Sequence, residues 1–172
     1  PVSPYGVSKA SILLLTKSYR NAYNLFVCTG ILFNHESELR PEHFVTKKII
    51  STVRRIANGS NEKLILGNTR VIRDWGWAPE YIEAMWLMLQ QKSASDYVIG
   101  TGKKYSLEQF VEKSFDVARL NWKDFVETDH TLLRPKEIRL SVADPEKACR
   151  DLGWSAETTM PELVEKLIEN QI

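Results

Sequence analysis

The sequence feature that most constrains the fold is a long amphipathic segment followed at once by a short apolar run. Residues 3–24 begin with Ser3, a residue type that caps helices, and with Pro4, which suits the first helical position. Apolar side chains then recur at three- and four-residue spacing up to Tyr23. Residues 25–33 are apolar and β-branched, interrupted only by Thr-Gly, which suits a strand buried on both faces of a parallel sheet. We therefore expect a helix and then a central strand.

The rest of the chain continues this alternation. The apolar spacing and the capping residues predict helices over 41–57, 78–89, 107–120 and 144–152, and a last helix from 158 onward. Short apolar runs predict strands at 64–68, 71–72, 97–99 and 125–127, and the polar segment 34–41 reads as a loop. The helix over 78–89 is apolar almost all round, so we expect it to be buried. Alternating strands and helices indicate an α/β fold.

The composition excludes several classes of protein. Of 172 residues, 43% are apolar, which predicts a folded core, and 23 Lys and Arg balance 22 Asp and Glu. A net charge of +1 gives no general attraction to nucleic acid or to a membrane surface, and no apolar run approaches the roughly 20 residues that cross a bilayer. Two cysteines, Cys28 and Cys149, fit neither a disulfide framework nor a metal site, so we expect a reducing, cytoplasmic setting. The chain begins without Met, as a piece of a longer protein would.

Tyr5 and Lys9 are the first candidates for chemistry. They are four residues apart and so lie on one face of the expected helix. An ammonium beside a phenol favours the phenolate, which makes a workable general acid or base. The alternative is a surface lysine beside a partly buried tyrosine.

The surroundings of this pair resemble a known family. The segments that carry the resemblance are 3–9, 30–37, 44–49, 66–68, 73–76, 81–91, 96–102 and 134–137. In this order they resemble the extended short-chain dehydrogenase/reductase family, and more closely its GDP-mannose 4,6-dehydratase branch, for which residues 32–37 and 73–76 are specific. The resemblance implies the C-terminal part of a Rossmann-like fold with a small mixed α/β substrate-binding domain. Residues 1–35, with later segments returning to them, would belong to the nucleotide-binding sheet.

The resemblance also implies roles for individual residues. Tyr5 would be the catalytic acid/base at the sugar 4-hydroxyl, and Lys9 would bind the nicotinamide ribose and tune Tyr5. The residues placed at the cofactor, NADP, are Tyr5, Lys9, His35 and Arg40. The residues placed around the nucleotide sugar, GDP-mannose or a relative of it, are Asn34, Val45, Lys48, Arg73, Arg134 and Glu137. Arg73 is expected at the diphosphate, and Arg134 with Glu137 at the neighbouring ribose or phosphate.

The sequence departs from the family pattern in one large respect. A dinucleotide pyrophosphate is normally bound at a glycine-rich turn that opens a helix, and no such motif occurs in this chain. The Thr and the Glu that serve the family's elimination step lie before the tyrosine motif and have no counterpart here. We therefore expect the C-terminal half of a dehydratase, inactive alone. The resemblance implies a homodimer or homotetramer, for which Ile12, Leu13 and Thr16 would supply a thin apolar stripe on the first helix.

Each candidate also has a purely structural interpretation. Asn34 and His35 can cap a strand end, Arg73 can be a sheet-edge arginine paired with Asp74, and Arg134 with Glu137 can form a surface ion pair. The residues expected in the core rather than in a site are Trp75, Trp77, Trp86, Met85 and Met88. Two other functions remain open: a reductase or epimerase of the same superfamily, and a non-catalytic GDP-sugar-binding module or remnant.

Overall fold

The computed structural model describes residues 1–133 and 136–169. Its helices are α1 (Pro4–Tyr23), α2 (Val45–Ala57), α3 (Ala78–Leu89), α4 (Leu107–Val117), α5 (Glu146–Leu152) and α6 (Met160–Glu169), with single 3-10 turns at Trp122–Asp124 and His130–Leu132. Its strands are β1 (Thr29–Leu32), β2 (Asn34–Glu36), β3 (Leu64–Leu66), β4 (Ile72–Arg73), β5 (Trp75–Trp77), β6 (Asp96–Ile99), β7 (Tyr105–Ser106), β8 (Val126–Thr128) and β9 (Leu140–Ser141). The described helices all lack the combination of length and apolarity that a bilayer span requires.

Parallel pairing dominates the strands. β1 pairs with β6, β2 with β5 and β3 with β8, each in parallel, and β4 lies between antiparallel β7 and parallel β9. Parallel neighbours need crossover connections, which the helices supply. The α/β class expected from the alternation is confirmed.

Local signals set the helix ends. The Ser3 hydroxyl accepts a hydrogen bond from the Gly6 amide at 3.1 Å, and Asn24 ends α1 in the left-handed region at φ 53°. Ser106 and Gln109 form the expected capping box at the start of α4. These boundaries agree with the sequence prediction.

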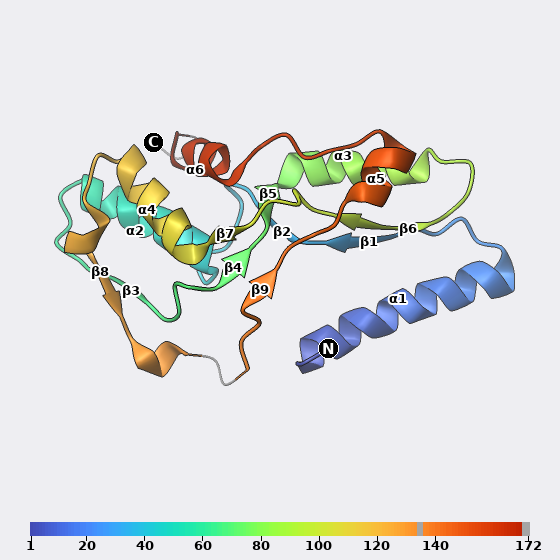
Figure 1. Cartoon of the computed structure of the whole chain (residues 1–172), viewed down its shortest axis with the longest axis horizontal. Coiled ribbons are helices and arrows are strands. Elements are labelled where there is room, and N and C mark those ends of the chain that lie inside the picture. Colours follow the sequence, from blue (N-terminus) through green and yellow to red (C-terminus); the bar gives the residue numbers. More distant parts are fainter. Residues whose placement is uncertain (134–135, 170–172) are drawn as a thin grey trace.

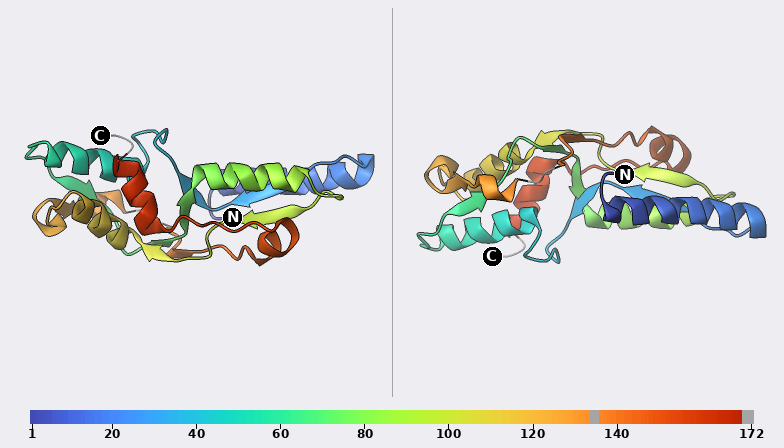
Figure 2. Two further views of the ribbon diagram at one scale, coloured as in Figure 1. Left: turned by 90° about the horizontal axis from the view of Figure 1, so that it is seen from above. Right: turned by 90° about the horizontal axis from the view of Figure 1, so that it is seen from below.

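The β1–β6 pair lies between α1 on one face and α3 with α5 on the other (Figures 1 and 2). The expected central strand is shorter than predicted, at Thr29–Leu32, and it is only half-buried. Among the described strands β1 has one partner, β6, so its second edge is open. Burial on both faces was nevertheless a wrong expectation, because no residue of β1 is fully buried and Ile31 is 40% exposed, and how closely neighbours cover a strand is not specified by an apolar run.

The buried apolar residues form two clusters. The larger cluster packs α2, α4 and α6 around β3 and Trp75, and the smaller one packs α3 and α5 against β6 around Tyr81 and Trp154. In Figure 1 the helices that form the larger cluster, α2, α4 and α6, lie in the left part of the molecule, and those of the smaller cluster, α3 and α5, lie in the right. Strands β2 and β5 run between them.

Three further expectations need correction. Residues 34–36 form β2 rather than a loop, and α2 begins at Val45 rather than at Pro41. Helix α3 is buried on one face only, and Trp86 is 60% exposed, whereas Trp75 and Met88 lie in the core as expected. An all-apolar helix composition does not reveal which face a neighbour covers.

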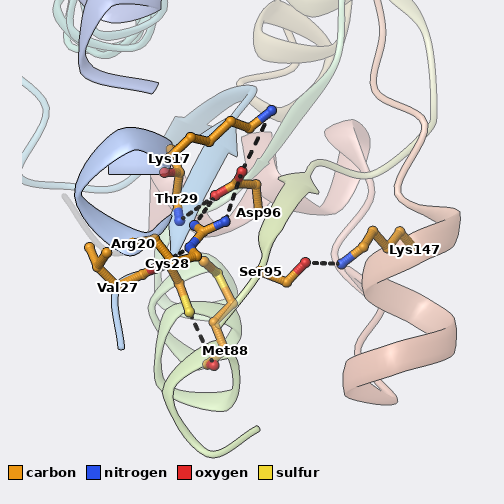
Figure 3. Close-up of polar contacts among 9 residues, drawn as sticks. All are labelled: Lys17, Arg20, Val27, Cys28, Thr29, Met88, Ser95, Asp96 and Lys147. Atoms are coloured by element: carbon orange, nitrogen blue, oxygen red, sulfur yellow. Dashed lines mark hydrogen bonds and ion pairs between the residues drawn. The ribbon is translucent and has the colours of Figure 1, made fainter. Parts of the chain in front are cut away.

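A polar cluster at the start of β6 ties α1 to the sheet (Figure 3). Both Nη groups of Arg20 donate to the Asp96 carboxylate, and Arg20 Nε donates to the Val27 carbonyl at 2.8 Å. The Thr29 amide also donates to Asp96, at 3.2 Å. On the other side, Lys147 Nζ of α5 donates to the Ser95 hydroxyl at 2.8 Å. Since no residue of α1 is buried, these contacts fix the helix that carries Tyr5.

Candidate functional site

Tyr5 and Lys9 lie on successive turns at the amino end of α1. Lys9 Nζ is 5.4 Å from the centre of the Tyr5 ring, so the ammonium lies against the aromatic face. Tyr5 is 72% exposed, which rules out the alternative of a partly buried tyrosine. The pair has the relative placement that the four-residue spacing predicts, and its phenol is accessible to a ligand.

A hollow of about 520 Å³ opens beside the beginning of the chain. The described residues that line it are Val2, Asn68, Leu133, Lys136, Glu137, Ile138 and Arg139. Asn68 Nδ2 donates to Glu137 Oε2 at 2.9 Å, which fixes that carboxylate at the wall. The hollow therefore places Glu137 near the segment that leads into the Tyr5 helix, and Lys136 and Arg139 bring positive charge to it.

His35 and Arg40 line a second hollow, of about 280 Å³, together with residues at the beginning of α3. His35 Nδ1 lies 2.8 Å from the Phe33 carbonyl, so Nδ1–H donates and Nε2 remains available to a ligand. The His35 ring also packs against Tyr81, with 5.0 Å between the ring centres. Two residues that the resemblance assigned to the cofactor are thus brought together.

Tyr81 supports this region from the core. It is fully buried, and its hydroxyl donates to the Asn34 carbonyl at 3.4 Å. Burial, reinforced by the charges of Asp74, Glu80 and Glu36, raises the pKa of the Tyr81 phenol, which therefore stays a hydrogen-bond donor. Nothing in the sequence singled out Tyr81 as part of a site.

The other residues assigned to the nucleotide sugar are spread along the chain. Asn34 begins β2, Val45 begins α2 and is exposed, and Lys48 Nζ donates to the Ile65 carbonyl at 2.7 Å. These three are not among the described residues that line the 520 Å³ hollow. Arg134 lies outside the described residues, and so does the ion pair suggested for it with Glu137.

Arg73 lies on β4, the central strand of the three-stranded sheet, so a sheet-edge position is wrong. Its Nη1 donates to the Ile72 carbonyl at 2.8 Å, and Arg73 is not among the described lining residues of the hollow. Its suggested partner Asp74 is fully buried and accepts from Thr101, Gly102 and Ala143. Asp74 thus holds the loop after β6 against the chain that follows β9.

Among the residues that the structure describes, no cluster of three His, Cys, Asp or Glu side chains is placed to bind a metal ion. The described groups instead suit an organic ligand with phosphates. A phenol beside an ammonium can move a proton. His35 and Arg40 offer donors beside a hollow, and planar guanidinium groups suit phosphate oxygens.

The comparisons with known proteins agree with one another. A family model described as GDP-mannose 4,6 dehydratase matches residues 1–167. GDP-mannose 4,6 dehydratase 2 of Arabidopsis thaliana is 46% identical over 172 residues, which are 100% of this chain and 46% of the relative. The human GDP-mannose 4,6 dehydratase is 40% identical over 189 residues, which cover 100% of this chain and 51% of the relative. The chain thus spans about half the length of these relatives.

Solved structures show the same fold at low identity. RMD from Pseudomonas aeruginosa, complexed with NADPH, superposes with a TM-score of 0.88 at 21% identity, covering 99% of this chain and 55% of that one. A dTDP-glucose 4,6-dehydratase from Bacillus anthracis in complex with NAD gives a TM-score of 0.86 at 20% identity, covering 98% and 52%. The Rossmann-like extended fold expected from the resemblance is confirmed.

Proposed function

This chain belongs to the GDP-mannose 4,6-dehydratase family, and from that premise we propose that it supplies the C-terminal half of an enzyme that converts GDP-mannose to GDP-4-keto-6-deoxymannose. One observation carries the proposal. The Tyr5 phenol is accessible, and the centre of its ring lies 5.4 Å from the Lys9 Nζ; both residues are on α1, and Val2, two residues before this helix, lines a 520 Å³ hollow. A nucleotide diphosphate sugar fits a hollow of this size with cationic walls.

The chemistry assigned to this half is proton transfer at the sugar 4-hydroxyl. Tyr5, as phenolate, takes the hydroxyl proton while the C4 hydride leaves, and Lys9 stabilises the phenolate by its charge. A nicotinamide cofactor held beside Tyr5 would supply the acceptor for that hydride and its return to C6 after water is lost across C5 and C6, with a proton returned to C5. The net change is the loss of one water molecule, and the cofactor is regenerated.

NADP is the cofactor we propose, held by Lys9, His35 and Arg40. Support comes from the hollow of about 280 Å³ that His35 and Arg40 share. A guanidinium and the Nε2 edge of a histidine there offer donors to phosphate or ribose oxygens. The pyrophosphate itself needs a glycine-rich turn, which this chain does not contain. Cofactor binding by the chain alone should therefore be weak.

The sugar nucleotide is proposed to contact Asn34, Val45, Lys48, Arg73, Arg134 and Glu137. Of these, Glu137 has direct support, because it lines the hollow and is fixed by Asn68. A homodimer or homotetramer is proposed through the outer side of α1, where Ile12 is about half-exposed. We assign the protein to the cytoplasm, in keeping with its two free cysteines.

Complementation tests the proposal. The chain is co-expressed with the part of the Arabidopsis thaliana relative that it does not cover, and GDP-mannose consumption is followed with NADP present. We expect GDP-4-keto-6-deoxymannose from the pair and no turnover from the chain alone. Tyr5→Phe should lower turnover by about 10²- to 10⁴-fold with GDP-mannose affinity retained, whereas Tyr19→Phe, farther along the same helix, should leave it unchanged.

Other outcomes identify the alternatives. A 4-epimer or a reduced sugar as product would indicate an epimerase or a reductase. Binding of GDP-mannose by the pair with no conversion would indicate a binding module. Full activity of Tyr5→Phe would remove the phenol from the mechanism.

A further inference from the structure

Glu36 is a buried acid beside the proposed cofactor site. It ends β2 and is 2% exposed. Glu36 Oε2 lies 3.0 Å from Arg40 Nε, and the space around the pair is too narrow for a water molecule. Burial raises the pKa of the Glu36 carboxyl, and the charge of Arg40 opposes that rise. The charge of Arg40 is therefore the main, though not the sole, compensation of the buried carboxylate.

Arg40 is held on two sides. Its Nε lies 3.0 Å from Glu36 Oε2 in an ion pair that lacks hydrogen-bond geometry, and its Cζ lies 3.7 Å from the centre of the Phe44 ring, so the guanidinium stacks on the aromatic face. Within the described part of the chain, Arg40 Nε makes no hydrogen bond, and none is found for Nη1 or Nη2 either. Arg40 lines the 280 Å³ hollow with His35 and Met85, so these two donor groups remain for a ligand.

Such a pair contributes little to stability. Desolvation of two charges offsets most of their attraction, and an apolar pair of similar volume often stabilises a fold as well. What the pair does provide is orientation, because a long arginine side chain otherwise samples many rotamers. Immobilising it before binding removes an entropic cost from binding.

We propose that Glu36 is a positioning residue that, with Phe44, fixes the Arg40 guanidinium so that Nη1 and Nη2 bind a phosphate group in the hollow beside His35. The inference rests on the proposed function in one respect, because the proposed function assigns this phosphate to the cofactor NADP. It goes beyond that function in assigning a role to an acid that touches no ligand. The same geometry would serve a phosphate of the nucleotide sugar.

The sign of one substitution separates orientation from charge. Glu36→Gln keeps the size of the side chain and removes a negative charge beside an anion site. By Coulomb attraction alone this change strengthens anion binding. If Glu36 acts by orienting Arg40, the same change weakens anion binding, because the ion pair that holds the guanidinium is lost.

The test uses the whole chain labelled with ¹⁵N and titrated with inorganic pyrophosphate. The Nε–Hε signal of Arg40 should exchange slowly with water before addition and shift during the titration. We expect Glu36→Gln to weaken pyrophosphate binding about fivefold and to speed exchange of this signal. Phe44→Leu, which removes the stacking partner at a partly exposed position, should act in the same direction and keeps the test valid if Glu36→Gln misfolds. Glu62→Gln, which breaks the exposed Arg55–Glu62 pair, is the matched control and should change neither.

Unchanged or tighter pyrophosphate binding by Glu36→Gln, or a rapidly exchanging Arg40 signal in the unaltered chain, would overturn the inference. NADPH, NADH and GDP titrations then assign the phosphate to the cofactor or to the sugar nucleotide. The complementation assay is independent of this result. If the co-expressed halves are inactive but Arg40 responds as expected, the proposed function alone is refuted. If the co-expressed halves are active but the Glu36→Gln chain keeps its pyrophosphate affinity, this inference alone is refuted.

Discussion

Replacing Asp96 by alanine should release α1 from the β1–β6 sheet. The Asp96 carboxylate accepts from both Nη groups of Arg20 and from the Thr29 amide, and the side chains of Asp96 and Arg20 are only 15% and 19% exposed. Hydrogen bonds to charged groups contribute about 1.5–3 kcal/mol each, and residual solvent contact favours the low end. Because Arg20 keeps its bond to the Val27 carbonyl, we expect a loss of about 2 kcal/mol in the free energy of opening α1.

Hydrogen exchange measures this loss directly. A detached helix of 20 residues is marginal in water, so its amides exchange once it leaves the sheet. About 2 kcal/mol corresponds to roughly 30-fold faster exchange in α1. Amides of α6, which packs in the larger core cluster, should change little. The control is Asp151→Ala, which breaks comparable but more exposed ion pairs with Lys147 and Arg150.

Equal exchange of α1 in the two variants would refute the reasoning, since packing rather than the carboxylate would then hold the helix.

The pH dependence of stability gives a second check on the role of Asp96. Burial disfavours ionisation of Asp96, but hydrogen bonds from Arg20 and Thr29 outweigh it and hold the pKa of the carboxyl below its usual 3.8. A lowered pKa means that the contribution is complete above about pH 4 and is lost as the pH falls through the folded-state value. The difference in urea midpoint between the chain and Asp96→Asn should therefore close below about pH 4.

Three shorter predictions concern the core, the site and a helix end. Gly76→Ala should lower the unfolding free energy by about 1–3 kcal/mol in urea denaturation, because a Cβ there would lie 2.5 Å from the Tyr81 ring. Arg73→Ala, assayed in the complemented enzyme, should raise the KM for GDP-mannose with kcat nearly unchanged, and a normal KM would count against its diphosphate role. Ser106→Ala should cost about 1 kcal/mol in thermal unfolding, because the hydroxyl that caps the Gln109 amide is lost.

Features fixed by a few neighbouring residues could be predicted from the sequence. Ser3, Ser106 and Gly153 act within one turn of chain, and each occupies the cap or the left-handed position that its residue type favours. The Tyr5–Lys9 pair is equally local, since helical spacing alone brings the ammonium to the ring. No distant contact is needed for any of these outcomes.

Features that depend on distant neighbours could not be predicted in this way. The run around β1 is as apolar as a strand buried on both faces, yet β1 is only half-buried and Ile31 is 40% exposed. Helix α3 carries Ile82, Trp86 and Leu89 on an exposed face, since β6 and α5 cover only its other side. The apolar composition of the helix does not indicate which side that is. The contact between Asn68 and Glu137 joins residues 69 positions apart, and no local pattern indicates it.

The same distinction separates the candidate site into two kinds of residue. Groups that would meet a ligand, such as Tyr5, are exposed and have a reactive type at a recognisable spacing, so motif comparison finds them. Groups that would hold them in place, such as Glu36 and Tyr81, are buried, and their roles follow from what they touch. Glu36 and Arg40 illustrate the difficulty, because a four-residue spacing ordinarily predicts an ion pair on a helix, whereas here a strand end and a loop bring them together. The supporting residues of a site therefore become visible only when the fold is known, and they are the positions where substitution should alter ligand affinity without removing a reacting group.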